Sequence, residues 1–390
     1  MRARPALLAL VAVLAVTVAT GLWWVQRDPP GPRAEGSLGD SSARLTDCVE
    51  TGPLRSVDDA NRFVRSVRGN GAFQGADVGA DVALQDGRRL WVFGDTLRAA
   101  DFDGQRFVRN SMLVIGDGCA EAVVPQDHGA VVPDRDERVG YWPMSVAREE
   151  HDGFDLVAVG TQRVRTTDAP DGAFAFESLG PSVAVFTVPA GGTPRLLAQR
   201  DLGDDDPDPA RPQWGAAAVV HDGWAYLYGT ARPDREGVFG FSLRVARVRP
   251  TDVLDLGAWR YWDGRRWQPR ADRAAVLVPA ERGVSQTLSV FERDGRWYAL
   301  SKRDEFLGSE VAVWQAPSPA GPWDDGTAVA SLPSDVDAGE LRYMPLAHPD
   351  LHPEPGRVLV SYSRNDTDVT KVTADPFRYR PAFMVVRLPG

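Results

Sequence analysis

The chain has 390 residues, of which 43% are hydrophobic, and its formal net charge is −10. This apolar content excludes a disordered chain, and the length fits a large all-β domain or more than one domain. The acidic balance argues against a nucleic-acid partner, because proteins that bind nucleic acids present a basic surface to the phosphates.

The first 28 residues form a predicted targeting segment. Two arginines precede an apolar run over residues 6–25, which is long enough to cross a bilayer. Its possible cleavage sites are weak, whereas the tryptophan pair at its end suits a membrane interface. An uncleaved anchor is favoured over a cleaved signal peptide, and both place the body outside the cytoplasm. Residues 29–45, rich in Pro, Gly and Ser, are the expected linker to a domain over residues 46–390.

Cys48 and Cys119 are the only two cysteines of the chain. In an exported protein, such a pair predicts a disulfide. It would join the segment before the first repeat to that repeat. Two unrelated buried thiols are the alternative.

A short helix is predicted from Val57 to Val67, with Asp58 near its N-terminal cap. After it, a hairpin of two apolar strands recurs five times, about 70 residues apart, and a third apolar strand follows each copy. The turn glycines of the five hairpins are Gly87, Gly153, Gly223, Gly295 and Gly356. Such a repeat predicts an all-β fold, a five-bladed β-propeller. A pair of β-sandwiches is the alternative, but it would not give five equivalent hairpins.

The first hairpin, residues 75–96, differs from the others in its acidic residues. Asp77 and Asp81 lie on the incoming strand, and Asp95 lies near the end of the outgoing strand. Carboxylates at strand ends are costly to desolvate without partners, so their placement calls for an explanation. Asp86-Gly87 between the strands predicts a type I′ turn, and this aspartate is interpreted as structural.

In a propeller, the starts of the inner strands and the ends of the second strands surround one mouth. Aromatic, amide and cationic side chains at the equivalent places in the other four repeats suit a sugar ligand. The predicted substrate-binding residues are Trp142, Trp214, Gln286, Tyr343, Arg364 and Asn365. The aromatic members would stack on sugar rings, or alternatively pack between blades.

Glycoside hydrolysis needs two carboxyl groups, one protonated and one ionised. Asp77 and Asp95 lie on paired strands of one blade, so both can reach the same mouth. Asp81 follows four residues after Asp77, on the same face but deeper, where it could tune a pKa or bond to backbone. The structural alternative is that Asp77 and Asp95 cap strand ends and turns.

Other chemistries lack their motifs. The sequence contains no HExxH, no GxSxG and no phosphate-binding loop, and the five histidines are expected to be surface or hydrogen-bonded residues on loops and turns. The acidic run over residues 201–208 lacks the spacing of a calcium-binding EF-hand loop, so we expect a solvated loop. No cofactor and no catalytic metal are expected, although a structural cation in the central funnel is compatible with the sequence.

Several stretches resemble the actinobacterial domain-of-unknown-function family numbered 4185. They read GADVGADVAL, LWVFGDT, YWPMSVA, APSPAGPW, YMPLAHPDL and VLVSYSRN, and the resemblance extends from residue 57 to the C-terminus. It implies a five-bladed propeller endo-D-arabinanase that cuts the D-arabinan of mycobacterial-type arabinogalactan and lipoarabinomannan. The family's paired aspartates would fall on Asp77 and Asp95. The membrane segment and the short inter-blade loops depart from the family pattern.

The leading hypothesis is an exported, monomeric glycoside hydrolase that acts on a cell-envelope polysaccharide, with the acid and the base or nucleophile roles open between Asp77 and Asp95. The first alternative is a membrane-held propeller that binds carbohydrate or protein without catalysis. The second is a lactonase- or lyase-type enzyme with a metal in the funnel.

Overall fold

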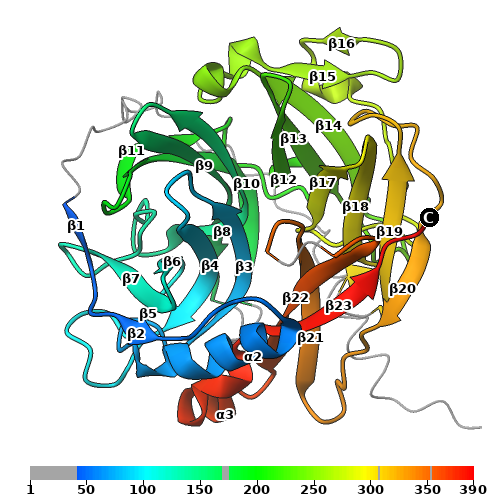
Figure 1. Cartoon of the computed structure of the whole chain (residues 1–390). Helices are drawn as coiled ribbons and strands as arrows, with labels where there is room; N and C mark the ends of the chain where they lie inside the picture. The colour runs from blue at the N-terminus through cyan, green and yellow to red at the C-terminus, as the bar shows by residue number, and fades with distance from the viewer. Residues whose placement is uncertain (1–41, 169–174, 306–307, 352–353) are drawn as a thin grey trace, which may run out of the picture. The chain divides into compact units, whose positions relative to one another are not determined.

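The computed structural model describes residues 42–168, 175–305, 308–351 and 354–390. These residues contain five antiparallel β-sheets (Figure 1). The first sheet contains β1 (Ala43–Leu45), β2 (Val49–Glu50), β3 (Gly75–Ala83), β4 (Arg89–Leu97), β5 (Phe107–Val108), β6 (Ser111–Gly116) and β7 (Cys119–Pro125). The second contains β8 (Val139–His151), β9 (Phe154–Thr166), β10 (Phe176–Pro189) and β11 (Arg195–Asp201).

The remaining sheets follow in chain order. The third contains β12 (Gln213–His221), β13 (Trp224–Ala231), β14 (Ser242–Val248), β15 (Arg260–Trp262) and β16 (Trp267–Gln268). The fourth contains β17 (Ser289–Arg293), β18 (Arg296–Lys302), β19 (Glu310–Ala316) and β20 (Thr327–Ser331), and the fifth β21 (Glu340–His348), β22 (Arg357–Asp366) and β23 (Ala382–Arg387). The helices are α2 (Val57–Ser66) and α3 (Val369–Ala374), with shorter helical turns η1 (Val67–Gly69), η3 (Pro250–Asp252), η4 (Leu256–Ala258), η5 (Ala271–Arg273) and η7 (Pro376–Tyr379).

The five sheets close into a ring. Their inner strands, β3, β8, β12, β17 and β21, each contact the next, and β21 in turn contacts β3. A closed circle of radially arranged sheets is the architecture of a propeller, and it excludes the pair of sandwiches. The predicted all-β propeller fold is therefore confirmed, and the inner two strands of each sheet form one of the five predicted hairpins (Figure 1).

The turn of the first hairpin differs from the prediction. Gly87 N donates to Leu84 O at 3.1 Å, and within the loop only Gly87 has a positive φ, 86°. This is a type I turn followed by a left-handed glycine, whereas a type I′ turn needs positive φ at both central residues. Asp86 instead accepts a hydrogen bond from Arg88 N at 3.0 Å, so it is structural as predicted.

Four of the five inner strands carry a β-bulge next to the residue expected at the mouth. The register shifts lie at Ala76/Val78, Pro143/Ser145, Trp214/Ala217 and Tyr343/Leu346. A bulge bends a strand and re-aims its side chains. Val78 and Met344, which directly follow Asp77 and Tyr343, have φ values of 64° and 45°, a region that non-glycine residues seldom adopt. The backbone is thus distorted where these two mouth residues project.

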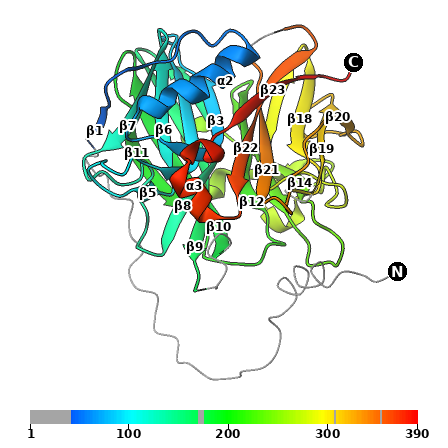
Figure 2. The same cartoon turned by 90° about the horizontal axis from the view of Figure 1, so that it is seen from below.

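Helix α2 lies next to β23, the outer strand of the last sheet, and is hydrogen-bonded to it. Asn61 Nδ2 donates to Phe383 O at 3.2 Å, and Phe383 N donates to Asn61 Oδ1 at 3.0 Å, as a neighbouring strand would. The helix cap is Ser56, whose side chain accepts from Asp59 N, rather than Asp58. Figure 2 shows α2 beside β23, so the first and last parts of the domain are joined here.

The start of the domain also differs slightly from expectation. β1 pairs with β7, so residues 43–45 belong to the first sheet and not to the linker. The disulfide between Cys48 and Cys119 is confirmed, with the two Cα atoms 5.5 Å apart. In the described ranges, no helix is long and apolar enough to span a bilayer. The predicted targeting segment, residues 1–28, lies outside those ranges.

Candidate active site

Asp77 and Asp95 lie on paired strands at the mouth, the end of the ring where β3 begins and β4 ends. Ala76 on β3 is paired with Thr96 on β4, and the charge of Asp77 acts on Asp95, so the two carboxyl groups lie near one another. The Asp77 carboxylate lies against Gly94, where a Cβ atom would meet Asp77 Oδ1 at only 2.5 Å. Both aspartates are half-buried, so each retains access to solvent or substrate.

Two tyrosines bind the Asp77 carboxylate. Tyr343 OH donates to Asp77 Oδ2 at 2.8 Å, and the Tyr379 hydroxyl also donates to this carboxylate. Asn365 Nδ2 lies 3.5 Å from Tyr343 OH, at the edge of the same group. Burial raises the pKa of Asp77 to about 6, although the two phenol donors oppose this shift by stabilising the charged form.

Asp95 has a different environment. Its Oδ1 accepts a hydrogen bond from Trp142 Nε1 at 2.7 Å. Burial raises the pKa of Asp95 well above its ordinary value, and the charge of Asp77 raises it further, while the Trp142 bond and the charge of Arg109 act in the opposite direction. Because Asp77 has two phenol donors and Asp95 has a like charge beside it, the pair favours an ionised Asp77 and a protonated Asp95.

Two predicted binding residues lie away from this group. Trp214 is only 6% exposed and packs on Tyr261, and its ring covers Gly229 of the neighbouring strand, so it is a core residue. Arg364 Nε donates to Arg380 O at 2.9 Å, and its guanidinium lies over the Phe377 ring. These contacts favour the packing alternative for Trp214 and a structural part for Arg364.

Gln286 belongs to a second polar group, on the fourth sheet's side of the ring. Its N–H donates to Glu305 Oε2 at 2.8 Å, and its carbonyl accepts from Thr230 Oγ1 at 2.8 Å. Burial raises the pKa of Glu305, and the bonds from Gln286 and Ser285 oppose that shift. Glu305 therefore holds the backbone of Gln286 in place, and Gln286 is half-buried.

Asp81 faces the fifth sheet, as Asp77 does, but deeper in the ring. Asp77 contacts Tyr343 on β21, and Asp81 contacts His348 on the same strand as well as Arg89. Burial opposes ionisation of Asp81, but the charges of Arg89 and His348 outweigh it and lower its pKa to about 2. Asp81 is thus an ion-paired group that joins the first and last sheets, and it binds side chains rather than backbone.

The contacts of His348 form a chain that superficially resembles a Ser-His-Asp triad. His348 Nδ1 meets Asp81, and His348 Nε2 lies 2.8 Å from Ser361 Oγ. His348 is 1% exposed and Ser361 0%, so this hydroxyl cannot reach a substrate. The histidine is hydrogen-bonded as expected, but it lies buried on a strand rather than on a loop. His352 lies outside the described residues.

Sequence reasoning missed Tyr379 and Glu305. Tyr379 ends η7, between α3 and β23, where no repeat pattern marks it. Glu305 lies just after β18, the second strand of its hairpin, and Asp95 lies near the end of the second strand of the first hairpin. This similar position is the signal in the sequence that could have identified Glu305.

The acidic run is not only a solvated loop. Asp201 and Asp205 pair with Arg163, whose side chain is fully buried, and with the more exposed Arg135. Arg163 Nη2 also donates to Leu179 O and Asp204 O, both at 3.1 Å. The run therefore neutralises a buried cation beneath the β9–β10 hairpin.

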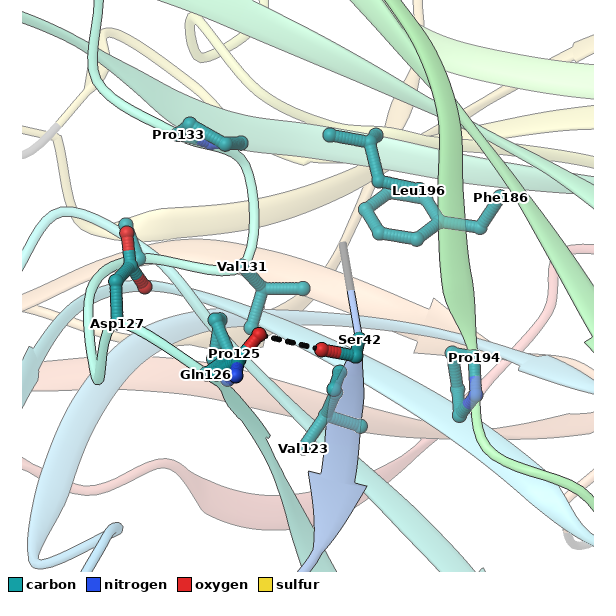
Figure 3. A pocket seen from close by; sticks show the side chains of 12 residues that line it. Ser42, Val123, Pro125, Gln126, Asp127, Val131, Pro133, Phe186, Pro194 and Leu196 are labelled. Carbon is teal, nitrogen blue, oxygen red and sulfur yellow. Dashed lines mark hydrogen bonds between the residues drawn. The ribbon is translucent and has the colours of Figure 1, made fainter. Parts of the chain in front are cut away.

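Two cavities lie elsewhere. The inner strands enclose a central cavity of about 340 Å³, bordered by Asp81 and Asp350, beyond the mouth residues. A cavity of about 350 Å³ at the outer edge of the first two sheets is mainly apolar; in Figure 3, Phe186 and Leu196 form one side and Ser42 Oγ donates to Gln126 Oε1 on the other. Nowhere in the described parts of the chain do three or more His, Cys, Asp or Glu side chains form a group suited to a metal ion. The funnel cation stays a prediction.

Comparison with solved structures found several similar chains, of which the first below supports the fold. A putative hydrolase from Bacteroides ovatus ATCC 8483 is 18% identical, with a TM-score of 0.60 over 82% of this chain and 89% of that chain. The GH43_1 enzyme from Xanthomonas citri with xylotriose is 15% identical (TM-score 0.44; 81% and 87% covered). A Cellvibrio cellulosa alpha-L-arabinanase mutant is 11% identical (TM-score 0.42; 80% and 91% covered).

Comparisons by sequence identify a family. No curated protein matches the chain. The family numbered 4185, which the motifs resemble, is not the one whose model matches. That model covers residues 59–388, nearly the whole described domain, and the chain therefore belongs to the family described as Domain of unknown function (DUF5005).

Proposed function

We propose that this protein is a glycoside hydrolase that cleaves a polysaccharide of the cell envelope with Asp77 and Asp95. The observation that carries the proposal is the unequal pair of adjacent carboxyl groups, because this chemistry needs one proton donor and one ionised group. Hydrogen bonds from two phenols favour an ionised Asp77, and the nearby negative charge of Asp77 favours a protonated Asp95. Asp95 is therefore the proposed acid, and Asp77 the proposed nucleophile or base.

D-arabinan, cut within the chain, is the proposed substrate. This part rests on the motifs of the first hairpin and on the later stretches that resemble endo-D-arabinanases. A mouth with Trp142, Tyr343 and Asn365 around the carboxyl groups suits a sugar, since rings pack on aromatic faces and hydroxyls bind polar groups.

Export is the proposed location. The apolar run over residues 6–25 would direct the chain across the membrane and could hold it there as an anchor. The Cys48–Cys119 disulfide is consistent with this, because structural disulfides persist in oxidising compartments.

Incubation of the full chain with D-arabinan, with L-arabinan and xylan as controls, tests the activity. We expect oligosaccharides of several lengths from D-arabinan alone. Binding to D-arabinan with no product would instead favour the non-catalytic propeller.

An aryl arabinoside with a good leaving group tests the roles, because its departure needs no proton. Asp95→Asn should retain more activity on this substrate than Asp77→Asn does. The reverse order would exchange the two roles.

A further inference from the structure

The second sheet rises above the mouth beside Asp95. Trp142 on β8 is paired with Gln162 on β9, and β9 continues four residues further, to Thr166. At about 3.3 Å per residue, the extension is about 13 Å. Phe176, the first residue of β10, is paired with Thr166 at its top. Figure 2 shows β9 and β10 extending beyond the neighbouring strands.

An exposed aromatic ring stands on this extension, next to the carboxyl pair. Phe176 is 38% exposed, and its ring centre lies 4.5 Å from that of Trp142, at an interplanar angle of 71°. Trp142 is itself fixed by its hydrogen bond to Asp95. The two rings thus make a continuous aromatic surface that leads away from Asp95.

Polar groups accompany the two rings. Thr166, the strand partner of Phe176, is exposed on the same face of the sheet, and its hydroxyl accepts a hydrogen bond from Arg109 Nη2 at 3.0 Å. Below them, the buried Arg163 binds Leu179 O, which holds the base of the hairpin in place. An exposed ring with a hydroxyl and a guanidinium on its own face of the sheet fits a neutral sugar better than a wholly apolar ligand.

We propose that Phe176, together with Trp142, forms a subsite for a sugar on the leaving-group side of the cleaved bond. The proposal rests on the proposed function: an acid at Asp95 lies beside the oxygen of the departing part of the chain, and because Trp142 is bonded to Asp95 we place that part along Trp142. Phe176 is the next aromatic ring along this direction. The ligand class is a neutral polysaccharide segment, with one ring packed on Phe176 and its hydroxyls near Thr166 and Arg109.

Phe176→Ala in the full chain tests the subsite, with Leu197→Ala as a matched control. Leu197 is 40% exposed and lies on β11, the outer strand of the same sheet. We expect Phe176→Ala to lower kcat/KM on polymeric D-arabinan about tenfold more than on an aryl arabinoside, which has no sugar beyond the aryl group. Leu197→Ala should change neither value. Equal losses on both substrates, or no loss on the polymer, would overturn the subsite.

A binding measurement separates this proposal from the proposed function. D-arabinan is titrated into Asp77→Asn and into the double variant Asp77→Asn/Phe176→Ala, and tryptophan fluorescence is followed. About tenfold weaker binding by the double variant supports the subsite, even if the wild-type chain releases no product. Equal affinities refute the subsite, even if the wild-type chain is an active hydrolase.

Discussion

Gly94→Ala should disable the site without disturbing the fold. Gly94 has no left-handed φ, so alanine fits its backbone, but the new Cβ would lie 2.5 Å from Asp77 Oδ1. Ordinary contact begins near 3.4 Å, so the carboxylate must retreat by about 0.9 Å. A misplacement of about 1 Å can cost on the order of 100-fold in rate, and we expect a loss of that size in kcat.

The assay is the initial rate of D-arabinan cleavage, together with thermal unfolding of the same samples. The free energy of unfolding should change little, because the displaced atoms end a side chain and a tolerated Gly-to-Ala change stabilises by about 0.4–1 kcal/mol. Gly71→Ala is the control, since its nearest neighbour is Ala99 Cβ at 3.9 Å. A folded Gly94→Ala protein with a rate within about threefold of wild type would refute the inferred role of the Asp77 position.

Three further predictions concern the groups around the site. Tyr379→Phe removes a donor to ionised Asp77, so the acidic limb of the kcat/KM profile should move up by about one pH unit; an unmoved limb would show that Asp77 ionisation does not control the rate. Asp81→Asn breaks the buried pairs with Arg89 and His348 and should lower the free energy of urea unfolding by about 3 kcal/mol. The low folded-state pKa of Asp81 stabilises the wild type above about pH 4, and this contribution fades as pH falls towards 2, so the variant should lose less stability over that range; parallel pH profiles would contradict the pairing. Arg163→Met leaves Asp201 and Asp205 without their buried partner and should lower the free energy of unfolding by about 3 kcal/mol. Arg135→Gln, at the more exposed end of the cluster, should lower it less. Equal losses would argue against a structural role for the buried ion pairs of Arg163.

The repeat made much of the fold predictable. Each hairpin combines apolar strands with a turn glycine, and local chemistry of this kind is visible in one sequence. The same alignment placed Asp77, Trp142 and Tyr343 at equivalent positions, and the structure brings Trp142 and Tyr343 to the two aspartates. The acids were conspicuous because the other hairpins do without them.

The rest depended on contacts between distant parts of the chain. The hairpin alignment matches Trp142 to Trp214, but Trp142 pairs with Gln162 and meets Asp95, whereas Trp214 pairs with Gly229 and covers it. The backbone conformation at the bulges determines this difference, and the repeat pattern of the sequence does not reveal it. Tyr379 reaches Asp77 from a non-repeating segment. The partner of the acidic run, Arg163, lies on another strand of the second sheet.

The most direct test of the account is the release of reducing ends from D-arabinan by the full chain and by its Asp77→Asn and Asp95→Asn variants. Both variants should fold, because removing a half-buried charge leaves the surrounding contacts in place. We predict that the wild type releases oligosaccharides and that each variant is slower by at least about 100-fold. Undiminished release by either folded variant would contradict the assignment of catalysis to these two aspartates.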